Sequence, residues 1–200
     1  MGRYLSGGSD GTGGGLSALH GVIIGVCQAL AAKLKSSPKI VQNAQVMKVN
    51  SYKIPESVLV VIYTPSADVL LIRRADAGTW QSVTGSKDFE AESWEKTAAR
   101  EVLEETGLNA QDPSFVLTDW AIENRYEIYP AWRFRYAPDV SHNLERVFGL
   151  ALPARMPIQL SPAEHTEFKW VPWQEAADTC FSPSNAEAIL MLPRWLQCTS

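Results

Sequence analysis

The chain has few cysteines. Its 200 residues include only three, Cys27, Cys180 and Cys198, and they lie too far apart for the short ligand spacings of zinc sites. A scattered odd number also argues against the paired cysteines that staple small secreted domains. The cysteines therefore exclude a disulfide framework and a zinc ribbon, and they predict reduced thiols in a cytoplasmic protein.

Long hydrophobic runs are equally scarce. The one extended apolar stretch, residues 16–32, is interrupted by Ser17, His20 and Gln28, and it is shorter than the roughly 20 residues that a membrane helix needs. It also lacks the clustered positive start and the cleavage site of a secretory signal. We expect neither a membrane span nor export.

Positive charge is sparse over most of the chain. The formal net charge is −4, and residues 1–46 carry a small positive excess, so the remainder is more acidic than the whole. A nucleic-acid-binding protein needs a basic surface, which argues against a nucleic-acid partner. An acidic domain that acts on phosphates would need metal cations as a bridge.

Glycine is concentrated at one end, since most of the 13 glycines fall in residues 1–25. Such a segment has too little apolar surface to offset its chain entropy. We therefore predict a glycine-rich extension over residues 1–46, poorly structured or partly helical, and a single domain over residues 47–200. The extension is expected to be dispensable, or to result from a start codon assigned too far upstream. No obligate protein partner is evident.

Hydrophobic periodicity and turn residues predict an α/β domain with a mixed sheet and helices on two faces. We expect strands at 57–63, 69–73, 80–84, 115–123, 128–136, 147–152 and 166–171. Helices are expected after Ser93, ending at Gly107, and at 173–179 and 184–196, the last bent by Pro193. In the first helix, Ala98, Ala99, Val102 and Leu103 are expected to pack on the sheet.

Three glutamates crowd one side of that first helix. At about 100° per residue, Glu105 lies about 40° and Glu104 about 60° from Glu101. Like charges at these spacings destabilise a helix, so the cluster calls for a cation, and oxygen ligands suit Mg²⁺ or Mn²⁺. A solvated acidic helix face is the alternative for these three residues taken alone.

The surrounding residues resemble the Nudix box, G-x5-E-x7-R-E-U-x-E-E-x-G-U, in which U is aliphatic. The matching positions are Glu92, Arg100, Glu101, Val102, Glu104, Glu105, Gly107 and Leu108. The departure is at the start, where Gly85 stands one residue too far from Glu92: either Ser86 replaces the glycine, or the loop has one extra residue. Arg100 could pair with Glu92 and tie this loop to the helix. The resemblance implies a Nudix-type α/β/α sandwich with a mixed β-sheet and Mg²⁺-dependent hydrolysis, with Mn²⁺ as a possible replacement.

Other segments resemble one Nudix subfamily, the bacterial dihydroneopterin triphosphate diphosphatases of folate biosynthesis. The similarity covers about residues 47–192 and includes the segments 80–86, 135–138 and 148–153, the pair Glu164-His165, and Ser182 with Asn185. It implies hydrolysis of 7,8-dihydroneopterin 3′-triphosphate to the monophosphate and pyrophosphate. The alternatives are a broader nucleoside-triphosphate or dinucleoside-polyphosphate pyrophosphatase and, in a different class, a non-catalytic Nudix-fold ligand sensor.

The resemblance also assigns residue roles. Glu101, Glu105 and Glu164 would hold metal, while Glu104 and Glu164 would be catalytic, orienting or deprotonating the attacking water. Glu167 is the competitor for Glu164.

The same resemblance places the substrate, a pterin or nucleoside triphosphate, against a set of other residues: Lys53, Arg73, Thr84, Tyr126, Glu127, Ile128, Tyr129 and Ser182. Lys53 and Arg73 can contact phosphate oxygens. Arg74 would point to the opposite face of a regular strand, so only one of the two arginines should reach the site. Tyr126 and Tyr129 could stack on the pterin, with Glu127 accepting from its N–H groups; sheet packing is the alternative for all three.

Overall fold

The computed structural model describes residues 52–196 of the chain. The predicted extension at residues 1–46 therefore lies outside the described residues, as do Cys27 and Cys198. Within the part of the chain that is described, no helix is long and apolar enough to cross a membrane.

One mixed sheet forms the centre of the domain. Strands β1 (Glu56–Tyr63), β2 (Asp68–Arg74), β3 (Trp80–Gln81), β5 (Val116–Glu127) and β6 (His142–Ala151) lie in the order β3-β2-β1-β6-β5. The short strand β4 (Val83–Ser86) also pairs with β1, and β7 (His165–Pro172) pairs with β2. Only β1 and β6 run parallel; the other pairs are antiparallel. The predicted mixed sheet is confirmed.

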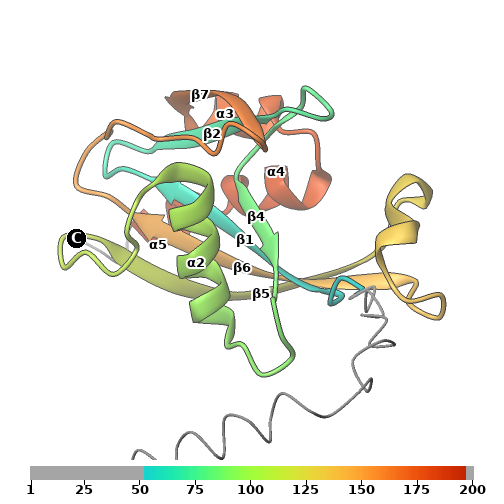
Figure 1. Cartoon of the computed structure of the whole chain (residues 1–200). Coiled ribbons are helices and arrows are strands. Elements are labelled where there is room, and N and C mark those ends of the chain that lie inside the picture. Colours follow the sequence, from blue (N-terminus) through green and yellow to red (C-terminus); the bar gives the residue numbers. More distant parts are fainter. Residues whose placement is uncertain (1–51, 197–200) are drawn as a thin grey trace, which may run out of the picture. The chain divides into compact units, whose positions relative to one another are not determined.

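Strand β1 is buried on both faces, and its alternate side chains enter two different cores. Val58, Val60 and Ile62 belong to one core, which includes Ala98 and Val102 of helix α2 (Trp94–Thr106). The intervening residues belong to the other core, which includes residues of α3 (Trp173–Thr179), α4 (Pro183–Leu190) and α5 (Leu192–Leu196). Figure 1 shows α2 on one face of the sheet and α3 and α4 on the other. The predicted α/β/α sandwich is confirmed.

Three predicted elements differ from the structure. The single strand expected at 80–84 is two short strands, because β3 pairs with β2 and β4 pairs with β1. Proline accounts for the other two differences. Residues 128–136 do not form a strand: β5 ends at Glu127, and a 3₁₀ helix, η1 (Pro130–Arg135), follows, because Pro130 has no N–H for a strand ladder. The single helix predicted at 184–196 is two helices, since α4 ends at Leu190 and α5 restarts at Leu192, next to Pro193.

Helix α2 begins and ends as its sequence predicts. The Ser93 side chain accepts a hydrogen bond from the Lys96 N–H, and Gly107 closes the helix in the left-handed conformation at φ 71°. The sheet-facing prediction is wrong for Leu103, which is 51% exposed. Leu103 is about 100° further around the helix than Val102, and this turns it to solvent. The buried side instead carries Glu101 and Glu105.

Candidate metal and substrate site

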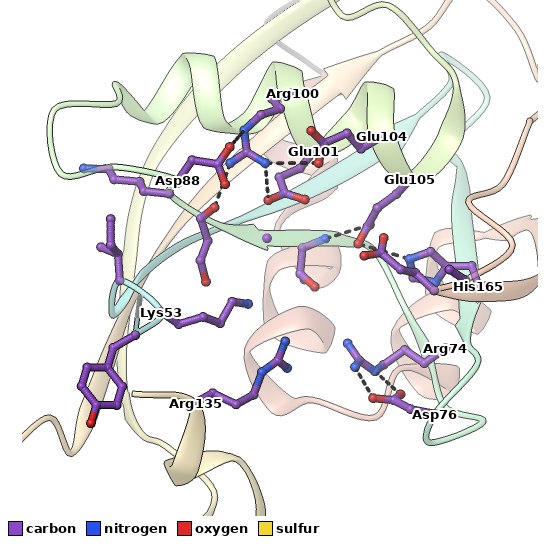
Figure 2. Close-up of a pocket in the computed structure, with 18 residues that line it drawn as sticks. Lys53, Arg74, Asp76, Asp88, Arg100, Glu101, Glu104, Glu105, Arg135 and His165 are labelled. Atoms are coloured by element: carbon purple, nitrogen blue, oxygen red, sulfur yellow. Dashed lines mark hydrogen bonds and ion pairs between the residues drawn. The ribbon is translucent and has the colours of Figure 1, made fainter. Parts of the chain in front are cut away.

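A polar cavity of about 520 Å³ lies at the edge of β4, beside helix α2. Its lining comes from separate parts of the chain: the segment before β1, the end of β2, β4 and the loop after it, α2, η1 and the turn before β7. Figure 2 shows two chemically different walls. The carboxylates of Glu101, Glu104 and Glu105 descend from α2 on one side, and Lys53, Arg74 and Arg135 face them from the other.

The carboxylate wall is built tightly at Glu101. Glu101 is only 9% exposed. A side-chain carbon added at Gly85 would stand 1.7 Å from the Glu101 carboxyl carbon. Only glycine leaves the carboxylate in this place. Gly85 therefore meets the steric need of the motif glycine, and the loop between it and Glu92 carries the extra residue.

Arg100 ties that loop to the helix, as predicted. Its Nε donates to Glu92 Oε1 at 3.0 Å, and its Nη2 donates to the Ser86 carbonyl oxygen at 2.8 Å. The hydrogen bond from Arg100 lowers the pKa of the buried Glu92 to about 2. Arg100 also contacts Glu101 Oε1 at 2.9 Å and Glu104 Oε2 at 3.2 Å and lies 3.4 Å from Asp88 Oδ2, so one guanidinium contacts four carboxylates and one carbonyl.

A second group of ligand atoms gathers around Glu105. One atom each from Glu105, Glu164 and His165 lies within 4.8 Å of the others. His165 Nε2 is 3.1 Å from Glu105 Oε1. This is an ion-pair distance without hydrogen-bond alignment, since neither ring nitrogen has an aligned partner within residues 52–196. Glu105 is also held by the Thr84 N–H at 3.3 Å.

The carboxylates on this wall are short of positive charge. Burial raises the pKa of Glu101 to about 7, and the neighbouring Glu105 adds to the rise against the opposing effect of Arg100. Burial likewise raises the pKa of Glu105, with Glu164 adding to it. Buried carboxylates gathered without sufficient cations fit a divalent metal ion, and an oxygen-rich set suits a hard cation. The residues present therefore fit the metal that the motif implies.

The opposite wall is a set of converging cations. Lys53 and Arg135 are joined through the backbone, because the Lys53 N–H donates to the Arg135 carbonyl oxygen at 2.8 Å. Burial lowers the pKa of the Lys53 ammonium, and the charge of Arg135 lowers it further. Arg74 completes the wall, paired with Asp76 through two hydrogen bonds of 2.8 and 2.6 Å. Such a wall is suited to an anion that brings several negative oxygens.

The structure places the two neighbouring arginines differently from what the sequence predicts. Arg74 lines the cavity, whereas Arg73 does not. Arg73 instead donates to Glu167 Oε1 at 2.6 Å and to the Gly78 carbonyl oxygen at 3.1 Å. The pairing of β2 with β7 shifts register between Arg73 and Arg74, so the strand is not regular there. The expectation that only one of the two reaches the site agrees with this arrangement, but the choice of Arg73 does not.

The other predicted site residues divide into two groups. Glu101, Glu104, Glu105, Glu164, Lys53 and Thr84 line the cavity together. Tyr126, Glu127, Ile128, Tyr129 and Ser182 do not line it. Ile128 is buried, and Ser182 caps helix α4 by accepting from the Asn185 N–H at 3.3 Å. Tyr129 packs edge-on against Trp132, with ring centres 5.5 Å apart.

Several lining residues were not predicted as site residues, and three of them carry groups that bear on the chemistry: His165, Arg74 and Arg135. His165 is 3% exposed and opens β7 one residue earlier than expected; the signal for it was its place beside Glu164 in the subfamily resemblance. Arg74 was set aside on the assumption of a regular strand. Arg135 belongs to the segment 135–138 that carries the subfamily resemblance, but it was given no role, because only the unforeseen helix η1 brings it to the cavity.

The sequence and the fold both match known proteins. The family model described as NUDIX domain matches residues 53–192. A dihydroneopterin triphosphate diphosphatase of Escherichia coli K12 is 41% identical over 145 residues, covering 72% of this chain and 95% of the relative. The Haemophilus influenzae protein of the same name is 39% identical over 140 residues, covering 69% of this chain and 87% of the relative.

A solved structure agrees with these relatives. The E. coli dihydroneopterin triphosphate pyrophosphohydrolase superposes with a TM-score of 0.64 at 41% identity, covering 69% of this chain and 94% of that one. The similarity therefore extends over nearly the whole of each relative and over most of the described residues here.

Proposed function

Because the chain belongs to the Nudix hydrolase family, we propose that it hydrolyses 7,8-dihydroneopterin 3′-triphosphate to the monophosphate and pyrophosphate with Mg²⁺. The relatives that match it at about 40% identity carry this activity in their names. Four residues of the box, Arg100, Glu101, Glu104 and Glu105, line one cavity together with Glu164. Mn²⁺ is the expected substitute metal.

The observation that carries the proposal is the two-walled cavity. Carboxylates of one helix face a lysine and two arginines across a space of about 520 Å³. A triphosphate fits between such walls, because its oxygens meet cations on one side and metal ions held by carboxylates on the other. Phosphoryl transfer depends mainly on this kind of positioning and electrostatic stabilisation.

Glu101, Glu105 and Glu164 would hold the metal ions. A bound divalent cation supplies charge neutralisation, polarises phosphate oxygens and lowers the pKa of water. His165 lies against Glu105 and can fix the orientation of that carboxylate, as groups behind metal ligands commonly do. Thr84 holds the same carboxylate from the strand side through its N–H.

Glu164 is the proposed base. It is exposed, lines the cavity and stands beside the buried Glu105, so water can reach it. It would accept the proton of the attacking water as the new P–O bond forms and one anhydride bond breaks. Glu104 is also exposed, and it would orient the same water. Glu167 is unsuited to this role, because it is paired with Arg73 outside the cavity.

Lys53, Arg74 and Arg135 would bind the phosphate chain. Arg74 and Arg135 replace Arg73 in this proposal, since Arg73 is engaged elsewhere. Arg74 can exchange its ion pair with Asp76 for one with a phosphate, because the Asp76 side chain is 56% exposed and water can hydrate its carboxylate.

A substrate panel tests the proposal. Pyrophosphate release would be measured with Mg²⁺ on dihydroneopterin triphosphate and on ATP, CTP, GTP and UTP. We expect kcat/KM for dihydroneopterin triphosphate to exceed that for ATP by at least about tenfold, the usual scale of discrimination by one pocket. Equal values would indicate a broad triphosphate pyrophosphatase, and binding without turnover would indicate a sensor.

A further inference from the structure

The guanidinium of Arg74 is held by two different side chains. Its Nε and Nη2 donate to the two carboxylate oxygens of Asp76 at 2.8 and 2.6 Å. Its Cζ atom lies over the ring of Trp132, 5.8 Å from the ring centre. A guanidinium within about 6 Å of an aromatic ring centre is attracted by the negative face of the ring. Of the three cations that face the carboxylates, Arg74 alone has such a ring contact within residues 52–196.

The two contacts of Arg74 respond differently to an incoming phosphate. The Asp76 carboxylate occupies N–H groups that a phosphate could also use, and its side chain is 56% exposed. The Trp132 ring takes none of these N–H groups, because it attracts the guanidinium through the charge alone. A phosphate can therefore replace Asp76 while the ring contact remains. Trp132 is the partner that Arg74 can keep when the substrate is bound.

Trp132 itself is supported by a series of aromatic rings. It belongs to η1, a helix without a buried residue, so burial in the core does not hold it. Its ring meets the Tyr129 ring edge-on with centres 5.5 Å apart, and the Tyr129 and Phe181 ring centres are 6.5 Å apart. The Phe181 N–H donates to the carbonyl oxygen of Trp80, in β3, at 3.1 Å. The rings therefore connect Trp132 to the sheet.

Support of this kind matters because the arginine side chain is long. Arg74 is the last residue of β2, and its side chain must reach from there into the cavity. Fixing a side chain with many rotamers costs entropy when it happens on binding. A guanidinium that already rests against a ring loses less entropy when a phosphate arrives, and the affinity for the phosphate is correspondingly higher.

We propose that Trp132 is a positioning residue, whose ring holds the Arg74 guanidinium toward the cavity so that the phosphate chain meets a cation already in place. The inference rests on the proposed function, in which Arg74 contacts phosphate. Trp132 itself does not line the cavity, so it acts through Arg74 and not on the reacting atoms. Loss of the ring should raise KM and leave kcat unchanged, as for an interaction that serves binding alone.

Two substitutions of Trp132 separate the ring from its apolar bulk. Trp132→Leu has no ring, and it should raise KM for dihydroneopterin triphosphate about fivefold, the scale of one cation–π contact at a partly exposed site. Trp132→Phe keeps a ring face and should raise KM by about twofold at most. Phe134→Leu is the matched control, since Phe134 lies on the same helix and is 80% exposed; its KM should equal that of the wild type.

A purely structural role would act by another route, because Trp132 could hold η1 and thereby Arg135. Double variants separate the two routes. If the ring acts through Arg74, Trp132→Leu should add nothing to the KM of Arg74→Gln but a full fivefold rise to that of Arg135→Gln. The opposite pattern, or an equal rise in both backgrounds, would overturn the inference. An unchanged KM in Trp132→Leu alone would overturn it as well.

Fluorine NMR tests the contact directly, and it decides the question if Trp132→Leu does not fold. In protein labelled with 5-fluorotryptophan, the Trp132 signal is the one that is missing from Trp132→Phe. This signal should shift in Arg74→Gln, and also when pyrophosphate and Mg²⁺ are added to the wild type. A Trp132 signal at the same position in Arg74→Gln as in the wild type would overturn the inference.

Binding of pyrophosphate distinguishes this inference from the proposed function. Titration calorimetry with pyrophosphate and Mg²⁺ measures the phosphate contacts without a pterin and without turnover. Binding that is about fivefold weaker in Trp132→Leu than in the wild type would support the inference even if dihydroneopterin triphosphate is not hydrolysed. Hydrolysis of that substrate with equal KM and equal pyrophosphate affinity in the two proteins would overturn the inference and leave the proposed function standing.

Discussion

The two walls of the triphosphate cavity are built in different ways. The carboxylate wall comes mainly from one helix, where Glu101, Glu104 and Glu105 stand at fixed spacings. The cationic wall is assembled from distant segments: Lys53 before β1, Arg74 at the end of β2 and Arg135 at the end of η1. A wall within one helix is fixed by local geometry, and a wall from three segments exists only after the chain has folded.

This difference has a consequence for what each wall can do. The carboxylate wall is rigid, because α2 is capped at both ends and Arg100 ties its glutamates to the preceding loop. It suits the precise placement that metal ions require. The cationic wall rests on exposed or half-buried side chains, and it suits the binding of phosphates. We therefore expect variants in the first wall to lower kcat and variants in the second mainly to raise KM.

The largest effect is expected at Glu105. Glu105→Gln keeps the shape and can still accept from the Thr84 N–H, so the fold should persist. Turnover should fall by about 10³, the upper range for removing one preorganised electrostatic group. The melting temperature of the metal-free protein should stay the same or rise, because a buried charge is removed. Steady-state kinetics at saturating Mg²⁺ and a thermal melt check both points, and a near-normal kcat would mean that Glu105 is not a ligand.

The next effect is expected at Glu164. Glu164→Gln should lower kcat by about 10², as for the loss of a general base, with little change in KM. Glu167→Gln is the control, because Glu167 lies nearby on β7 but is paired with Arg73. Measured kcat and KM for both variants would decide; a large loss in Glu167→Gln with a mild one in Glu164→Gln would move the role to Glu167.

Variants of the two neighbouring arginines, Arg74 and Arg73, test the cationic wall. Arg74→Gln should raise KM by about tenfold, the effect of losing one charged hydrogen bond to the substrate. Arg73→Gln should change KM little, because Arg73 is held by Glu167 and Gly78 outside the cavity. The reverse result would restore Arg73 as the phosphate contact. A fall in kcat without a rise in KM for Arg74→Gln would contradict the expectation that variants in the cationic wall mainly raise KM.

The smallest effect concerns the pH dependence of stability in metal-free protein. The pKa of Glu101 is raised from 4.5 to about 7 in the folded protein. Between these values the folded state holds a proton that the unfolded state releases, so stability falls as pH rises. Without metal, the melting temperature should therefore be a few degrees lower at pH 7.5 than at pH 5.5. Glu92 does not disturb this window, since with a pKa of about 2 it stays ionised throughout.

Melting curves in EDTA at both pH values measure this effect. Mg²⁺ should raise the melting temperature more at pH 7.5 than at pH 5.5, because it replaces the missing positive charge. Glu101→Gln should reduce the pH dependence. A metal-free protein that is more stable at pH 7.5, with the same slope in Glu101→Gln, would show that burial does not perturb this carboxyl group.

The same contrast explains what the sequence could predict. Ser93, Glu92, Arg100 and Gly107 act within one loop and helix, so their spacing was enough to predict the caps and the ion pair that the structure contains. The mixed sheet with helices on two faces followed from apolar runs of strand length, such as β1, and from the helices expected between them, while the α/β/α sandwich was what the family resemblance implied.

Long-range features were beyond that reasoning. The irregular register at Arg73 and Arg74 depends on pairing with β7, far along the chain. Arg135 reaches the cavity only because Pro130 turns the chain into η1 after β5.

The central claim is that metal and triphosphate meet between the two walls. The most direct test is a crystal structure with Mn²⁺ and a non-hydrolysable analogue of dihydroneopterin triphosphate, with anomalous scattering used to locate the metal. We expect Mn²⁺ peaks in contact with Glu101, Glu105 and Glu164, and phosphate oxygens in contact with Lys53, Arg74 and Arg135. Mn²⁺ bound away from these carboxylates, or phosphates bound outside this cavity, would contradict the account.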